Sequence, residues 1–169
     1  ESFSARGIAA KESGSWTLGN FTAKINDSEI IAEGSLYPSL DVTVETKALD
    51  LHKTASLIPN INTYGVSGFF TGKSTLRISG KDISAKGEGE LKEALVEGIP
   101  LSSISAKWNC DKGLMEVEVS DSKIFGSSII GRLLFDARNK EKKMELKASV
   151  KELTFSDWTE NFSEKMPKD

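Results

Sequence analysis

The sequence predicts an almost all-β domain, built as one curled antiparallel sheet, from two observations. Apolar and polar residues alternate with a period of two through most of the chain, as in Met115–Val119 and Met144–Val150. This pattern is typical of strands with one apolar and one wet face. Short turn sequences, such as Asn26-Asp27 and Asp111-Lys112-Gly113, separate the alternating runs and favour hairpins between successive strands. We therefore expect about ten to twelve strands, with a β-sandwich as the alternative architecture.

The clearest strands are predicted by alternating runs, and two further strands by their glycines. In chain order, the alternating runs are 21–26, 42–45, 103–108, 115–120 and 144–151. Glycines interrupt two other candidate strands, one at Gly68 and Gly72 and the other at Gly87 and Gly89. Glycine inside a strand marks a bulge, a bend or a close backbone approach. A strongly curled sheet needs such positions.

Two segments depart from the strand pattern and predict short helices. In 51–58, apolar residues recur four and then three positions apart, which places them on one helical face. Asp50 is a candidate N-cap and Pro59 a stop signal for this helix. In 156–163, two aromatic residues lie four positions apart. We expect both helices at the rim or the end of the sheet, as a plug or lid.

Composition is typical of a single folded domain spanning residues 1–169. The chain is 38% hydrophobic and 28% charged, with a formal net charge of −3, which are ordinary values for a globular protein. No basic run provides a phosphate-binding stripe, so we expect no nucleic-acid partner. Cys110 is the single cysteine, and therefore no intramolecular disulfide is possible. With neither a signal peptide nor an apolar run of about 20 residues, we interpret the chain as a segment of a longer protein.

Catalytic and metal-binding patterns are not evident in the sequence. His52 is the single histidine, so a catalytic triad or a histidine-based zinc site lacks its other members. Glu116, Glu118 and Glu145 alternate with apolar residues, which is typical of a solvated strand face rather than of a paired-carboxylate site. We therefore expect no enzymatic activity, no cofactor and no metal.

Three tryptophans, Trp16, Trp108 and Trp158, raise the alternative of a carbohydrate-binding platform. Trp108 lies in the apolar register of its strand, which favours packing against the sheet. A carbohydrate-binding domain remains one alternative function, and an inert structural or adhesion domain remains the other.

A spacing pattern extends through residues 41–158. A short helix ends at a proline, glycine-bounded strands follow, and a Gly-Ile-Pro link leads to further hairpins. The positions that carry the pattern are Pro59, Gly65, Gly68, Gly72, Gly80, Gly87, Gly98, Ile99, Pro100 and Gly131. This pattern resembles that of the AsmA-like envelope proteins, most closely the TamB type. The charged stretch 140–143, at a hairpin tip, departs from it.

The resemblance implies a β-taco, a curled sheet forming a trough with an apolar concave face and a wet convex face. It also implies a location in the periplasm, as part of an inner-membrane-anchored protein that bridges the two membranes of the bacterial envelope. The implied function is phospholipid transport or support of outer-membrane assembly. The implied partners are a phospholipid or other acyl-chain ligand and an outer-membrane assembly barrel protein.

The trough interpretation predicts which side chains form the lipid groove. They are the in-register apolar residues Val42, Val44, Ile104, Ala106, Trp108, Met115, Val117, Val119, Met144, Leu146, Ala148 and Val150. The side chains expected on the opposite face are Lys107, Glu116, Glu118, Lys147 and Lys151. Because large exposed apolar patches are rare on soluble monomers, an uncovered apolar face would distinguish a trough from a sandwich.

Overall fold

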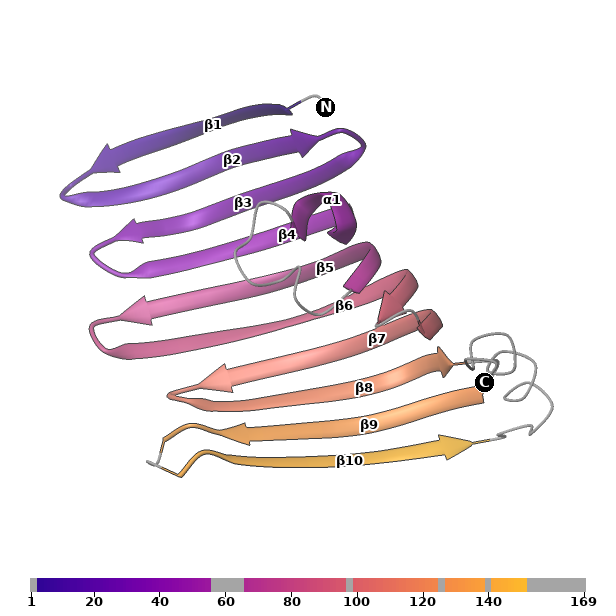
Figure 1. Cartoon of the computed structure of the whole chain (residues 1–169). Coiled ribbons are helices and arrows are strands. Elements are labelled where there is room, and N and C mark those ends of the chain that lie inside the picture. Colours follow the sequence, from indigo (N-terminus) through magenta and orange to yellow (C-terminus); the bar gives the residue numbers. More distant parts are fainter. Residues whose placement is uncertain (1–2, 56–65, 97–98, 125–126, 139–140, 152–169) are drawn as a thin grey trace.

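The computed structural model describes residues 3–55, 66–96, 99–124, 127–138 and 141–151. These residues form one ten-stranded antiparallel sheet and one short helix (Figure 1). The strands are β1 (Phe3–Glu12), β2 (Ser15–Ile25), β3 (Ser28–Tyr37), β4 (Leu40–Asp50), β5 (Val66–Ser79), β6 (Asp82–Val96), β7 (Ile99–Asp111), β8 (Leu114–Ile124), β9 (Ser127–Asp136) and β10 (Lys143–Lys151).

The order of strands in the sheet is the order in the chain, from β1 at one edge to β10 at the other. The sheet is thus a simple meander, and the colours in Figure 1 run from indigo to orange across it. The predicted all-β class and antiparallel pairing are confirmed, and ten strands fall within the expected range. The alternative sandwich is not found among the described residues, because all their strands belong to one sheet.

Tight hairpins make the meander possible. The β1–β2 turn uses Ser13 and Gly14, and the β7–β8 turn uses Lys112 and Gly113, all with positive φ. Two consecutive positive φ angles are typical of a type I′ turn, whose twist matches that of the flanking strands. The predicted turns Asn26-Asp27 and Asp111-Lys112-Gly113 both connect paired strands, so these two hairpins are confirmed, whereas the turn at Ser13 and Gly14 was not predicted.

The helix α1 (Leu51–Ala55) follows β4 directly and packs against β4 and β5. Asp50 caps it, because the Lys53 amide donates to the Asp50 carboxylate at 3.1 Å. The predicted start of the first helix is confirmed, while the rest of the expected 51–58 segment lies outside the described residues. The second expected helix, 156–163, also lies outside them.

Shifts in strand pairing fall toward one end of the central strands. The shift between β4 and β5 involves Ala48 of β4, which has a φ of 48°. The shift between β5 and β6 involves Gly68 of β5, with a φ of 129°, and Glu93 of β6, with a φ of 50°. Two more shifts occur between β7 and β8, and another between β8 and β9 after Val119. Because bulges bend a strand and increase its twist, β4 to β9 deviate here from regular pleating.

Candidate functional site

All twelve predicted groove residues lie on one face of the sheet, which we call the apolar face. Residues paired directly across an antiparallel ladder share a face, and the pairings define three rows that cross β4 to β10. The first row is Val42, Leu76, Ala85, Cys110, Met115, Phe135 and Met144; the second is Val44, Ser74, Gly87, Trp108, Val117, Leu133 and Leu146; the third is Thr46, Gly72, Gly89, Ala106, Val119, Gly131 and Ala148.

The remaining two predicted residues extend the same face. Ile104 is two residues from Ala106 and lies opposite Leu91. Val150 is two residues from Ala148 and lies opposite Ile129. Because side chains two apart in a strand point to the same side, both belong to the apolar face.

Several residues of this face were missed by the sequence analysis. Phe70, Leu76 and Leu91 come from β5 and β6, where glycines obscure the alternation. Leu133 and Phe135 come from β9, where the neighbouring Leu134 makes the apolar run continuous. A spacing of two was present in each strand, but the face could be assigned only from the pairing.

The apolar face is exposed on the edge strand β10 and half-buried on most of the other strands. Met144 is 72% exposed, Leu146 68% and Val150 47%, while Val42 is buried at 8%. The predicted groove residues of β7 and β8 are half-buried. In the part of the chain that the structure describes, the fully buried apolar side chains are confined to Ala23, Ala32, Val42, Ala94 and Leu101. The apolar face is therefore not the covered core of a closed sandwich in these residues.

Two aromatic rings lie close to glycines at the centre of this face. The Phe70 and Trp108 ring centroids are 6.3 Å apart, with a tilt of 40° between the rings. A Cβ atom on Gly87 would lie 2.5 Å from the Trp108 ring, and one on Gly89 would lie 2.6 Å from the Phe70 ring. The glycines thus allow close approach of the rings to the backbone, as their position in the sequence suggested.

The tryptophans do not form a common platform in the described residues. Trp108 is half-buried on β7, whereas Trp16 is 42% exposed on β2, with Lys11 Nζ 5.8 Å from its ring centroid. Five strand spacings separate β2 from β7, which is roughly 24 Å. Trp158 lies outside the described residues.

The opposite face, which we call the charged face, carries the polar residues expected there. Its central row alternates in charge from β4 to β9 and then ends in two adjacent cations; it comprises Glu45, Lys73, Glu88, Lys107, Glu118, Arg132 and Lys147. Lys107 Nζ lies 3.3 Å from a Glu88 carboxylate oxygen, and Arg132 pairs with Glu116. Lys151 lies on this face too, four residues from Lys147 on the same strand.

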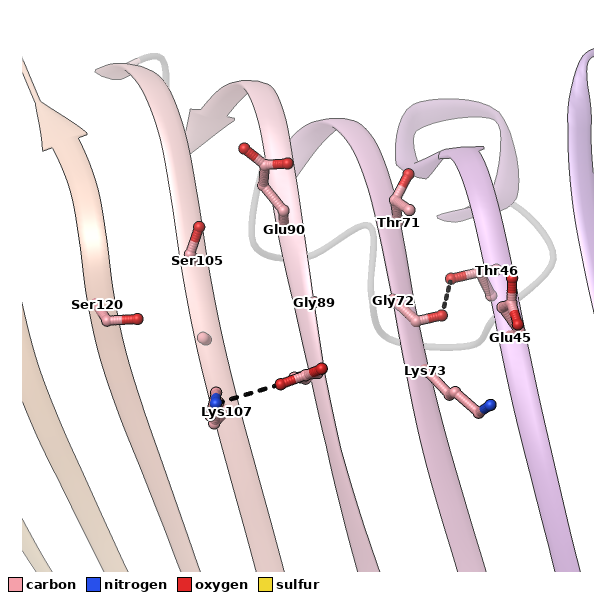
Figure 2. Close-up of a pocket in the computed structure, with 12 residues that line it drawn as sticks. Glu45, Thr46, Thr71, Gly72, Lys73, Gly89, Glu90, Ser105, Lys107 and Ser120 are labelled. Atoms are coloured by element: carbon pink, nitrogen blue, oxygen red, sulfur yellow. Dashed lines mark hydrogen bonds and ion pairs between the residues drawn. The ribbon is translucent and has the colours of Figure 1, made fainter.

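A shallow hollow of about 540 Å³ lies over this charged row (Figure 2). Its floor includes the backbone of Gly72, Gly89 and Ala106. Its lining also includes Thr71, Ser105 and Ser120 and four charged residues of the row, Glu45, Lys73, Glu88 and Lys107. Within the described residues, no group of three or more His, Cys, Asp or Glu side chains is placed to hold a metal ion.

Perturbed carboxyl groups lie away from this hollow. The pKa of Asp136 is lowered to about 2, chiefly because the Arg138 side chain donates hydrogen bonds to it at 2.8 and 2.7 Å. The pKa of Asp50 is lowered by the hydrogen bond from the Lys53 amide. The pKa of Glu145 is lowered by its ion pair with Lys147. Each shift therefore arises from a local partner at a strand end, helix cap or sheet edge.

The two reactive residue types singled out in the sequence lie far from one another in the fold. His52 is exposed in α1, and Cys110 is half-buried in β7, in the first row of the apolar face. Cys110 thus lies near the end of β7, close to the turn at Lys112 and Gly113.

Comparisons with protein-family models, with curated proteins and with solved structures find no match to this chain. Within the described residues, no helix has the length and apolar character required to cross a bilayer. The site is thus defined by its own geometry: one sheet with an apolar face and a charged face.

Proposed function

We propose that this chain is a non-enzymatic, lipid-conducting segment that holds acyl chains against the apolar face of its sheet. The observation that carries the proposal is the gathering of all twelve predicted groove residues on one face, which is exposed on β10 and half-buried on most of β4 to β9. Large exposed apolar patches on proteins are typical of interaction sites. A phospholipid acyl chain is a suitable occupant because it needs continuous apolar contact and forms no hydrogen bonds.

The dimensions of the face suit this occupant. The rows of the apolar face cross the strands from β4 to β10, which extend about 29 Å at the usual strand spacing, close to the roughly 30 Å of a bilayer's hydrocarbon core. Each CH₂ group transferred from water to an apolar surface contributes about 0.8 kcal/mol. An acyl chain lying across several strands would therefore gain enough to be retained, while its headgroup stays in water.

In this proposal the sheet curls into a trough, and the acyl chains lie along the apolar face, opposite the hollow on the charged face. The pairing shifts in β4 to β9 support curvature, because bulges are the usual means by which strands bend. The rings of Phe70 and Trp108 lie close to the glycine backbone, which would leave room above them for a chain to pass.

The context that we propose follows from the resemblance to AsmA-like envelope proteins. The chain would be part of a periplasmic, inner-membrane-anchored protein of the TamB type, working in phospholipid transport or outer-membrane assembly. An outer-membrane assembly barrel protein would be a further partner.

A pair of photocrosslinking probes tests the site. Val117 and Glu118 are adjacent in β8 but point to opposite faces, since they pair with Trp108 and Lys107 respectively. With a benzophenone amino acid at either position and phosphatidylethanolamine vesicles as the lipid source, we expect crosslinked phospholipid from position 117 and not from 118. Equal labelling at both positions, or none at 117, would contradict the proposal.

The substitution Val117→Asp separates an open groove from a covered core. Val117 is half-buried, so we expect a loss of about 1–2 kcal/mol in the free energy of unfolding, with the new carboxylate hydrated. An unpaired charge in a closed core would cost far more and unfold the domain. Urea denaturation measures the loss, and crosslinking from a probe at the neighbouring groove position Val119 should fall in the same variant. Collapse of the fold would indicate a covered face.

A further inference from the structure

The outer edge of β10 combines exposure with an incomplete charge pattern. Among the described residues, β10 pairs with β9 on one side and with no strand on the other. All nine residues of β10 are exposed. In an antiparallel ladder, alternate backbone N–H and C=O groups of an edge strand point away from its neighbour. Such an edge is a template for an added strand.

The charged face shows what this edge lacks. Across β4 to β9 the central row alternates strictly between acidic and basic residues, but Arg132 of β9 lies opposite Lys147 of β10. Each cation has an acidic neighbour: Arg132 pairs with Glu116, and Lys147 pairs with Glu145 of its own strand at 2.6 Å. The Lys147 side chain is still 78% exposed. An acidic residue on the outer side of Lys147 would give this lysine the oppositely charged cross-strand neighbour that it lacks.

The rest of β10 repeats this bias. Its charged-face positions are Lys143, Glu145, Lys147, Ser149 and Lys151, and its apolar-face positions are Met144, Leu146, Ala148 and Val150. A strand complementary to this edge would place acidic residues opposite the lysines and apolar residues opposite the apolar positions. Cross-strand pairs of these kinds stabilise antiparallel sheets.

We propose that the edge of β10 binds an extended, acidic, amphipathic segment of a protein partner as an additional antiparallel strand. The added strand would continue both faces of the sheet, with apolar side chains on the apolar face and carboxylates on the charged face. Backbone hydrogen bonds supply affinity in this mode of recognition, and alternate side chains supply specificity. This inference goes beyond the proposed lipid function and does not depend on it.

A second copy of this chain fits the edge less well. Two β10 strands side by side would bring together six lysines and two glutamates, since each contributes three and one. Pairing β10 with β1 of another copy would bring two cations, Arg6 and Lys11, alongside this basic edge and only one acidic residue, Glu12. Like charges placed opposite one another destabilise a sheet.

A designed peptide tests the inference on the full chain. The probe is the capped peptide Glu-Val-Thr-Val-Glu-Val-Lys-Val-Glu, which, run antiparallel to β10, places glutamates opposite Lys143, Lys147 and Lys151 and lysine opposite Glu145. We expect saturable binding, together with slower hydrogen exchange at alternate amides of β10. The same peptide with its charges reversed, or N-methylated on the paired amides, should not bind.

Two charge reversals locate the binding edge. Lys147→Glu should weaken peptide binding about fivefold, because one cross-strand attraction becomes a repulsion. Lys107→Glu, on the same row but three strands away, should leave the affinity unchanged. Equal affinity for both variants, protection confined to β1, or dimerisation through β10 in place of peptide binding would each overturn the inference.

Discussion

Gly89 provides a direct test of the aromatic packing on the apolar face. A Cβ atom at this position would lie 2.6 Å from two atoms of the Phe70 ring and 3.0 Å from the Thr71 carbonyl oxygen. The ring would have to move, and the β5 backbone would have to shift by a few tenths of an ångström. We therefore expect Gly89→Ala to lower the free energy of unfolding by about 1–3 kcal/mol, the usual cost of overpacking.

A matched glycine provides the control for this substitution. Gly131 lies in the same row of the apolar face, and its added Cβ would meet the Lys147 carbonyl oxygen at 3.2 Å and no ring. Gly131→Ala should therefore cost much less than Gly89→Ala. It also removes conformational freedom from the unfolded chain, which offsets part of any cost.

A double-mutant cycle then assigns the effect to the ring. In a Phe70→Leu background the two closest atoms are absent, so Gly89→Ala should cost at least 1 kcal/mol less than in the parent. Urea denaturation followed by circular dichroism measures each corner of the cycle. A coupling energy near zero would refute the reasoning, because it would mean that the ring does not lie on Gly89.

Two further predictions concern polar contacts at the ends of the strands. The Ser28 side chain is buried, accepts a hydrogen bond from the Asp50 amide at 3.2 Å and donates one to the Ala48 carbonyl at 2.9 Å. Because Ser28→Ala removes both hydrogen bonds, it should lower the free energy of unfolding by about 2 kcal/mol. An unchanged urea midpoint would contradict this prediction. Asp136 should titrate near pH 2 in the folded protein. Its pKa should rise after Arg138→Ala but stay below the ordinary 3.8, because the amide of residue 138 still donates to the carboxylate; carboxyl NMR follows both titrations. The pKa of Asp136 is lower in the folded than in the unfolded protein, so the contribution of the Asp136–Arg138 pair to stability is present above about pH 4 and is lost as the pH falls through 2. Identical titrations of Asp136 in the parent and in Arg138→Ala would disprove the contact.

The sequence predicted the faces of the strands better than their arrangement. Met115, Val117 and Val119 alternate so regularly that their common face followed from the period alone, and the pairing confirms it. The number of sheets did not follow, because an amphipathic strand can face a second sheet or an open groove with the same sequence. The pairing shift at Ala48 could not be predicted from the sequence either, because nothing about an alanine indicates a positive φ of 48°.

The charged row illustrates a second limit. Period-two alternation predicted that Lys107 and Glu118 lie on the charged face, but not that they lie opposite one another or that Lys107 pairs with Glu88. Opposition depends on the register, which turn lengths and bulges set together. The alternation of charge across neighbouring strands therefore became visible only in the folded sheet.

Register is a particular problem for a sheet with little buried core. A slip of one residue would exchange the two faces, and the apolar pattern opposes it. A slip of two residues keeps every side chain on its own face and needs another barrier. In one direction, such a slip of β6 along β7 would place Lys86 opposite Lys107 and put Ala85, in place of Gly87, beneath the Trp108 ring. Charge repulsion and the added methyl group both oppose that movement.

The opposite slip meets a steric barrier. It would place the Trp108 ring over Gly89, where the Phe70 ring already lies 2.6 Å from the position of an added Cβ atom. Two rings cannot occupy that space, so one would have to leave the sheet and expose its glycine backbone. Charges on one face and rings on the other therefore oppose slippage in complementary directions. The Phe70 and Trp108 rings, which pack closely on the glycines of the apolar face, thus also help to hold the strands in the register that forms this face.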